Sequence, residues 1–279
     1  MKLSLSTYFF VQEPLGKEHA VMLRENGFDK IELWGMPPHL DLSNPEPPQE
    51  LAKIFSGEGI SISTVHGPFY ENIEYAMRGN WLSISDMNEK KRKKAIDFIM
   101  RTADVMKNFN DCRVMVVHFG AGGDANRQEV LENLISSTIA LQEQLSSYDI
   151  QLAFENLNTP FSSSGYLKNF LEMYEFSNFG ICLDTGHANV REEVSSSILN
   201  CGSHLVALHA SDNKGTEDEH LAPEHGNINW ERVWGALREV GYDGNFTVEV
   251  TSTPDKEKTL KEIREFWDNI NKSGTDYTV

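Results

Sequence analysis

The chain has 279 residues, of which 39% are hydrophobic, and it carries a formal net charge of −17 at pH 7. A chain of this length buries a large core without disulfides, and it has the usual length of one α/β barrel. The negative charge argues against broad, non-specific nucleic-acid binding, because such binding depends on positive side chains that neutralise phosphates.

The cysteines and the N-terminal segment indicate the cellular compartment of the protein. Cys112, Cys182 and Cys201 show no CxxC spacing and indicate buried free thiols in a reducing compartment. The opening MKLSLSTYFFVQEP lacks the apolar region and the cleavage site of a signal peptide. Since no apolar run approaches ~18 residues, no segment is expected to span a membrane. We therefore expect a cytoplasmic protein.

Strand-like and helix-like runs alternate along the whole chain. Short apolar runs rich in β-branched residues predict eight strands: Leu3–Phe9, Lys30–Trp34, Ile60–His66, Arg113–His118, Ile150–Glu155, Gly180–Asp184, Leu205–His209 and Asn245–Val250. Amphipathic runs predict eight helices: His19–Asn26, Pro48–Glu58, Met87–Asn108, Asn126–Ser147, Tyr166–Phe176, Glu192–Leu199, Trp230–Val240 and Lys256–Ile270.

Eight βα units predict an α/β fold with a single (β/α)8 TIM barrel domain over residues 1–279. A doubly wound sheet is the alternative, but it would not gather side chains from so many strand ends. Three long loops, Met36–Pro48, Gly67–Asp86 and Ala210–Asn229, follow predicted strands two, three and seven. They should lie on the C-terminal face, where barrel active sites are built.

Metal-capable side chains end most of the predicted strands or follow them closely. They are His66, His118, Glu155, Asp184, His187, His209, Asp218, His220 and Glu249. Imidazole and carboxylate together suit Zn, Mn, Fe or Co chemistry. Parallel strands would direct these ligand types toward one point, so the series predicts a metal-binding active site.

The nine residues divide into three groups. Glu155, Asp184, His209 and Glu249 close strands five to eight, where no Lys or Arg offers the alternative of an ion-pair network, so they predict a divalent-metal site. His66 and His118 form a second site if Glu155 bridges, or else hydrogen-bonded histidines in a sugar pocket. His187, Asp218 and His220 form a third site, or else solvated loop residues. One site is expected, and up to three are available.

Several other side chains have two interpretations. Trp34, Phe69 and Tyr70 could cap a sugar ring, which is the commoner use of aromatic residues at a barrel mouth, or wedge into DNA. Glu32 could line the pocket or support another residue. The basic run Lys90–Lys94 surrounds a helix rather than sharing one face, so we interpret it as solvent-exposed rather than as a phosphate site.

Taken together, the strand ends resemble the xylose isomerase-like barrel superfamily, which includes endonuclease IV-type enzymes and metal-dependent sugar isomerases and epimerases. The matching stretches, spread over essentially the whole chain, are VHGPFYENI, VVHFGAG, AFENL, CLDTGHAN, LHASDN, DEHLAPEHGNINW and VEV. This ordered series of motifs is specific for the superfamily, but it says little about which substrate the protein binds. The resemblance implies that Glu155, Asp184, His209 and Glu249 bind one metal ion, with the two glutamates flanking the substrate.

The resemblance leaves two activities open. The first is a divalent-metal-dependent (Zn, Mn or Co) sugar or sugar-phosphate isomerase or epimerase, with proton transfer by Glu155 and Glu249 through a metal-stabilised enediolate. In that enzyme His66, His187 and Asn156 would orient hydroxyls, and Trp34 and Phe69 would line the pocket. The second is a zinc-dependent apurinic-site endonuclease, whose three-metal pattern all nine ligand positions match. A non-catalytic binding barrel is disfavoured by the paired glutamates.

Departures from the endonuclease pattern favour a small substrate. Where that branch usually has arginines beside the loop Asp, this chain has Glu217 and Glu219, and Glu224 replaces a usual glycine. These carboxylates would repel a DNA phosphate. We therefore expect a small carbohydrate partner rather than nucleic acid or a membrane, while the oligomeric state stays open.

Overall fold

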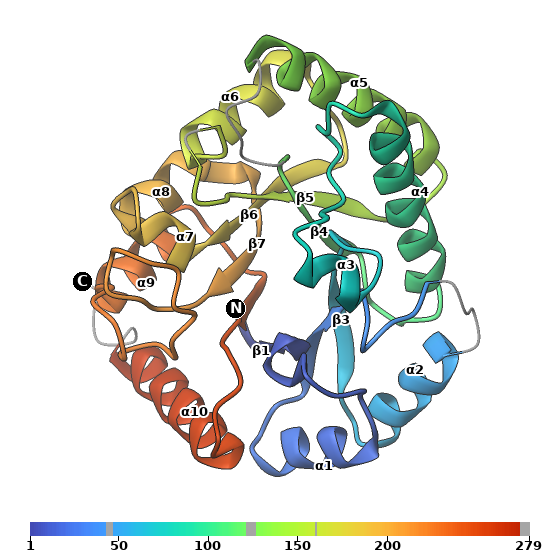
Figure 1. The fold of residues 1–279 in the computed structure, drawn as a ribbon. Helices are drawn as coiled ribbons and strands as arrows, with labels where there is room; N and C mark the ends of the chain where they lie inside the picture. Colours follow the sequence, from blue (N-terminus) through green and yellow to red (C-terminus); the bar gives the residue numbers. More distant parts are fainter. Residues whose placement is uncertain (43–46, 121–126, 160, 274–279) are drawn as a thin grey trace.

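The structure, a computed structural model, describes residues 1–42, 47–120, 127–159 and 161–273. Eight parallel strands pair in chain order, and β8 closes on β1 to complete a barrel. Helices surround this barrel on its outside (Figure 1). The (β/α)8 prediction is therefore confirmed.

The strands are short and almost wholly buried, as expected where the barrel interior covers one face and helices cover the other. They are β1 (Lys2–Ser6), β2 (Lys30–Trp34), β3 (Ser61–His66), β4 (Val114–His118), β5 (Gln151–Glu155), β6 (Phe179–Asp184), β7 (Leu205–Ala210) and β8 (Asn245–Val248). All six residues of β6 are buried.

Eight of the helices follow the predicted amphipathic runs to within a few residues, and two short helices, at 73–77 and 185–189, were not predicted. The helices are α1 (Lys17–Glu25), α2 (Pro47–Gly57), α3 (Ile73–Met77), α4 (Glu89–Met106), α5 (Arg127–Leu145), α6 (Ser164–Tyr174), α7 (Thr185–Asn189), α8 (Val194–Cys201), α9 (Trp230–Glu239) and α10 (Lys256–Ser273), with 3₁₀ helices η1 (Thr7–Phe10) and η2 (Gly202–His204). No helix of the described residues combines the length and apolarity needed to cross a membrane.

Three local predictions differ from the structure. The first strand ends at Ser6, because the Ser6 side chain accepts a hydrogen bond from the Tyr8 amide and starts η1. The long loop after β3 contains α3, whose N-cap Asn72 accepts from the Tyr75 amide. Asp184 ends β6 and also caps α7 through the His187 amide. Asn126, the first residue of a predicted helix, lies outside the described residues.

Among the described residues, three apolar clusters are buried. The largest fills the space between strands and helices, a second lies among the strands and contains Val116, Ala153, Cys182 and Ala207, and a third consists of Trp34, Met36 and Tyr70. All three cysteines are free and buried, and burial raises the pKa of the Cys182 thiol. Cys182 is therefore a packing residue, as its position in GICLD predicted.

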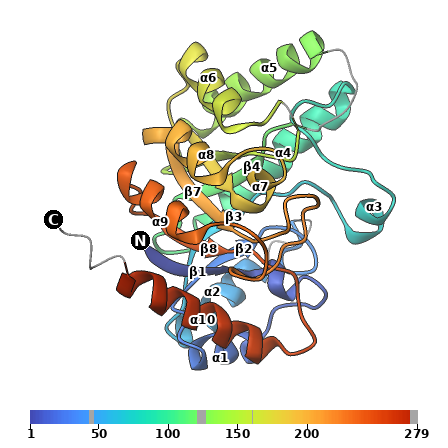
Figure 2. The same cartoon turned by 90° about the vertical axis from the view of Figure 1, so that its left-hand side faces the viewer.

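The strand register brings the predicted ligands level with one another. His118 pairs with Glu155 across β4 and β5, and Asp184 pairs with His209 across β6 and β7. Since all strands are parallel, these positions lie at one end of the barrel, and α3 projects from that same end (Figure 2). The fold thus places the site at the C-terminal face.

Candidate functional site

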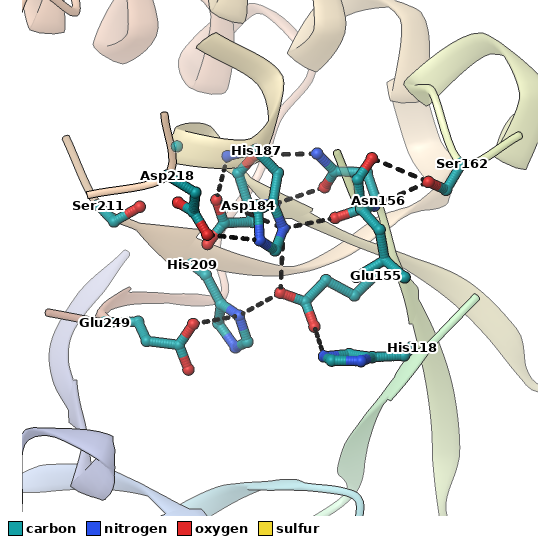
Figure 3. A network of polar contacts seen from close by, with 12 residues as sticks. His118, Glu155, Asn156, Ser162, Asp184, His187, His209, Ser211, Asp218 and Glu249 are labelled. Carbon is teal, nitrogen blue, oxygen red and sulfur yellow. Dashed lines mark hydrogen bonds and ion pairs between the residues drawn. The ribbon is translucent and has the colours of Figure 1, made fainter. Parts of the chain in front are cut away.

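All nine predicted ligands lie together at this end of the barrel. They form three groups, and within each group one ligand atom per residue lies within 4.8 Å of the others: Glu155, Asp184, His209 and Glu249; His66, His118 and Glu155; and His187, Asp218 and His220. The groups adjoin, because Glu155 belongs to two of them and His187 lies close to both (Figure 3).

The central group is the most buried. Nδ1 of His209 lies 3.1 Å from Oε1 of Glu155 and 3.4 Å from Oε2 of Glu249. None of its three carboxylates pairs with a Lys or Arg among the described residues. Oδ2 of Asp184 is buried and has no hydrogen-bond partner there. Three buried carboxylates around one imidazole, two of them (Asp184 and Glu155) with an oxygen that no hydrogen bond among the described residues satisfies, suit a divalent cation.

Glu32 supports this group from behind. Its Oε1 lies 3.0 Å from Nε2 of His209, and the carboxylate is 1% exposed. Nδ1 of His209 therefore faces Glu155 and Glu249, while Nε2 faces Glu32. A carboxylate behind a histidine fixes the ring and raises its basicity as a ligand. Glu32 was predicted either to line the pocket or to support another residue. The structure favours the second role, with His209 as the residue that Glu32 supports.

In the second group, two histidines converge on one oxygen. Nε2 of His66 and Nε2 of His118 each lie 3.3 Å from Oε2 of Glu155. Nδ1 of His66 lies 2.9 Å from the Gly67 carbonyl, so Nδ1 must donate. In neutral His66, Nε2 is then an acceptor facing a carboxylate. This contact is favourable only with a cation between the two atoms or a second proton on the ring.

The third group repeats this arrangement. Nε2 of His187 and Nε2 of His220 each lie 3.0 Å from Oδ2 of Asp218. Their Nδ1 atoms lie 2.8 Å and 3.1 Å from the carbonyls of Asn156 and Glu249. Backbone carbonyls thus fix both rings with Nε2 directed at the carboxylate. Oδ1 of Asp218 is also buried without a hydrogen-bond partner among the described residues.

The two central glutamates have opposite pKa shifts. Burial raises the pKa of Glu155, but His209, His118 and His66 outweigh it and hold the net pKa well below the usual range. Burial also raises the pKa of Glu249, and there His209 offsets only part of the effect. Two carboxyl groups whose environments separate their pKa values are the usual arrangement of a paired acid and base.

The position of Asn156 corrects one prediction. Its Nδ2 donates to the Asp184 carbonyl at 3.0 Å, and its Oδ1 accepts from the Asp184 amide at 2.6 Å. The side chain is buried and does not line the cavity. Because both polar atoms bind the backbone of Asp184, Asn156 holds the end of β6 in place and does not face a substrate.

Asp212 is a site-building residue that the sequence reasoning missed. Its Oδ1 accepts from the amides of Asn213 and Ile228, and its Oδ2 accepts from the Glu224 amide and the Trp230 indole. This fully buried carboxylate therefore holds the loop that carries Asp218 and His220. The signal in the sequence is the Asp-Asn pair that begins one residue beyond β7, since Asp side chains organise turns through backbone amides.

A cavity of about 600 Å³ opens above the three groups. His66, His118, Glu155, His187, His220 and Glu249 are among its lining residues, and so are Trp34, Phe69 and Tyr70. Phe69 stacks on His118 with ring centroids 4.2 Å apart, and Trp34 packs against His66 at 4.6 Å. The predicted aromatic residues therefore form a wall directly beside the histidines.

The basic run after the second long loop lies away from this cavity. Lys90, Lys91 and Lys93 are exposed, and Lys93 pairs with Glu89 at 2.7 Å. Lys94 pairs with Glu71. These side chains are solvated and locally neutralised, as the sequence interpretation held.

Comparisons with known proteins agree with this architecture. The family model described as "Xylose isomerase-like TIM barrel" matches residues 21–270. The chain is 29% identical to the uncharacterized protein MJ1311 of Methanocaldococcus jannaschii (97% of this chain, 91% of the relative) and 24% identical to D-psicose 3-epimerase of Ruminiclostridium cellulolyticum (80% and 74%). A solved D-tagatose 3-epimerase-like protein superposes with a TM-score of 0.81 at 26% identity (98% and 99%). The chain therefore belongs to the xylose isomerase-like TIM barrel family.

Proposed function

We propose that this protein is a divalent-metal-dependent epimerase or isomerase that acts on a sugar. The observation that carries the proposal is the pair Glu155 and Glu249, which approach the same His209 nitrogen, line one cavity and have opposite pKa shifts. Binding alone needs no matched acid and base. The similarity to D-psicose 3-epimerase and to a D-tagatose 3-epimerase-like protein supports the same reaction class.

The central group would hold the catalytic cation. Its fit rests on three buried carboxylates without a Lys or Arg partner and on the unsatisfied Oδ2 of Asp184. When bound, Zn, Mn or Co supplies positive charge that stabilises the oxygens of a ketose and of the enediolate derived from it. Asp184 and His209 are ligands in this proposal, and Glu155 and Glu249 are both ligands and proton carriers.

The two glutamates perform the proton transfer. Glu155, held ionised, takes a proton from the carbon beside the sugar carbonyl. Glu249, whose pKa is raised, returns a proton to the opposite face of that carbon, which inverts it. In the reverse reaction the two roles exchange. His66 and His187 would orient hydroxyls, and Trp34 and Phe69 would pack against the carbon skeleton.

An apurinic-site endonuclease is the second candidate, because all three ligand groups are assembled. The loop that carries Asp218 argues against it, since Glu217 and Glu224 are exposed there. Glu219 lies 3.3 Å from Lys214 and neutralises the positive charge of that lysine. Carboxylates at this rim would repel a DNA backbone, and so would the net charge of −17.

The test compares both activities on the same preparations. Protein loaded separately with Mn, Co or Zn is incubated in D₂O with D-fructose, D-psicose, D-tagatose and L-ribulose, and exchange of the proton beside the carbonyl is followed by NMR. We expect exchange with at least one ketose and no cleavage of an oligonucleotide containing an abasic site. Glu249→Gln should lower conversion of a ketose into its epimer by ~10³-fold or more, because the group that completes the transfer is gone, while Glu155 can still exchange the proton on its own face.

Glu217→Gln is the matched control, because it removes a carboxylate at the rim and leaves the ligand groups intact. It should exchange ketose protons like the wild type. Formation of the epimer at the wild-type rate by Glu249→Gln would remove the acid–base assignment. Metal-dependent cleavage of the abasic strand, increased by Glu217→Gln, would establish the endonuclease instead.

A further inference from the structure

The cavity is larger than a monosaccharide needs. A free hexose has roughly twelve non-hydrogen atoms and fills on the order of 200 Å³ at the density of organic crystals. The cavity measures about 600 Å³. Even with ions and ordered water at the ligand groups, a substantial outer part of the cavity remains beyond a sugar that contacts Glu155 and Glu249.

This outer part is walled by apolar side chains. Val11, Ile73, Ala76, Met77 and Trp81 line it, and three of them belong to α3. Met77 is 84% exposed, Trp81 47% and Ile73 46%. Figure 2 shows α3 standing apart from the ring of helices at the open end of the barrel. Exposed apolar side chains gathered at a cavity rim mark a surface that a ligand covers.

The polar atoms of the wall are largely engaged with each other. Nε1 of Trp34 donates to the Tyr70 hydroxyl at 2.9 Å, and that hydroxyl donates to the Pro37 carbonyl at 2.7 Å. Tyr8 and Gln12 provide the other polar groups of the wall. A second sugar ring would bury several hydroxyls here without enough partners, which is unfavourable.

Charge excludes an anionic substituent. Among the side chains that the structure describes, no lysine or arginine lines the cavity. Its charged lining consists of Glu155, Glu249 and histidines beside Asp218. Sites that recognise phosphate commonly use Arg or Lys, and among the described residues the outer wall offers neither.

We infer that the natural substrate is a ketose or keto-glycoside bearing an uncharged apolar substituent, which packs against Ile73, Met77 and Trp81. The inference rests on the proposed function, since it requires the sugar to lie over Glu155 and Glu249. The ligand groups hold the sugar, and α3 selects the substituent. Burying one face of an aromatic ring against aliphatic side chains strengthens transition-state binding by about tenfold or more.

The experiment measures kcat/KM for proton exchange with five probes: D-fructose, 1-O-benzyl-D-fructose, 6-O-benzyl-D-fructose, D-fructose 6-phosphate and isomaltulose, which carries a glucosyl group at O6. One benzyl ether should exceed D-fructose by about tenfold or more, and the phosphate should fall below D-fructose. Equal rates for benzyl ether and free sugar would overturn the inference, as would a preference for the phosphate or for isomaltulose.

A double substitution locates the effect. Ile73→Ser with Met77→Ser should reduce the ratio of benzyl ether to D-fructose to near one. Met173→Ser is the matched control, because Met173 lies on α6, outside the cavity, and is 72% exposed. This control should keep both the ratio and the basal rate. An unchanged ratio in the double variant would overturn the assignment to α3.

Failure of the proposed function is distinguishable from failure of this inference. If the metal-loaded protein exchanges no proton of any probe, the epimerase proposal fails. Binding is then measured by quenching of tryptophan fluorescence, which requires no turnover. Tighter binding of a benzyl ether than of D-fructose, lost in the double variant, would still support the apolar subsite, and equal binding would overturn it.

Discussion

Glu32 Oε1 lies 3.0 Å from Nε2 of His209, on the side of the ring opposite the atom that faces Glu155 and Glu249. Both residues are almost fully buried. The pair places one negative charge behind a ring that already faces two, so His209 is held in one orientation. His209 thus connects the interior of the barrel to the proposed metal site.

Glu32→Gln should weaken metal binding by about 10–100-fold and leave the fold intact, because the amide fixes the ring less firmly and lowers its basicity. Competition with a fluorescent chelator measures the dissociation constant. Glu172→Gln is the matched control, since Glu172 pairs with His204 at 3.5 Å far from the ligand groups. Wild-type affinity in Glu32→Gln would contradict the supporting role.

Metal removal should destabilise the protein, and Asp184→Asn should reverse part of that effect. Burial, partly offset by His187, raises the pKa of Asp184, so its ionised form is unfavourable at neutral pH. In excess chelator, the melting temperature of Asp184→Asn should exceed that of the wild type. The increase should be about 2–4 °C for each kcal/mol by which removal of the buried charge raises the unfolding free energy. Asn keeps the Oδ1 acceptor for the His187 amide.

With Mn, Co or Zn present, this order should invert, because the variant has lost a ligand. Differential scanning calorimetry with and without metal provides both comparisons. A lower melting temperature of the variant in both conditions would show that Asp184 has a purely structural role.

Metal uptake should release protons. Burial lowers the pKa of His220, but Asp218 and Glu249 outweigh it and raise that pKa to about 10. Burial also lowers the pKa of His187 and of His209, but Asp184 and Asp218 at His187, and Cys182, Glu249 and Glu32 at His209, raise it well above the usual range. A cation that takes these nitrogens displaces their protons, so apparent affinity rises with pH over the range in which they are protonated.

Calorimetry in buffers of different ionisation enthalpy counts the released protons. His220→Asn should release about one proton fewer if the third group binds metal. In protein freed of metal by a chelator, the protonated histidines stabilise the fold. This stabilisation is fully present below about pH 6.5 and is lost as pH rises toward 10. Affinity that falls as pH rises would contradict the assignment of His209 as a ligand.

Asp212→Asn should loosen the loop from 212 to 230. The amide cannot accept at both positions, so some of the four hydrogen bonds from Asn213, Ile228, Glu224 and Trp230 are lost. Unfolding free energy should fall by about 1–3 kcal/mol. Hydrogen exchange should accelerate around Asp218, with weaker binding at the third group.

Asp255→Asn is the control for this loop, because Asp255 accepts from the Lys258 amide at 3.0 Å in an exposed part of the chain. It should leave hydrogen exchange in the loop unchanged. Wild-type protection of the loop in Asp212→Asn would show that the buried carboxylate does not hold it.

The barrel, and the meeting of the nine predicted ligands at one end of it, could be predicted from sequence because both depend on short-range patterns. Apolar runs ending in His, Asp or Glu indicate strands of a parallel sheet, and parallel strands end on one face. His118 beside Glu155 and Asp184 beside His209 follow directly from that rule.

What could not be predicted depends on contacts between distant segments. The role of Asn156 follows from its pairing with the backbone of Asp184, and that of Asp212 from amides up to sixteen residues away. The early end of β1 depends instead on a local contact, the hydrogen bond that the Ser6 side chain accepts from the Tyr8 amide. In each case the residue type suits several roles, and only its neighbours decide among them.

Glu155 belongs to two ligand groups, with Oε1 facing His209 and Oε2 facing His66 and His118. Two ions that share one carboxylate cannot load independently. The first ion fixes the Glu155 side chain and neutralises part of its charge, which changes the affinity for the second. By thermodynamic linkage the effect is reciprocal. Titration with metal should therefore show sequential, unequal steps, so metal supply would set which form of the protein is present.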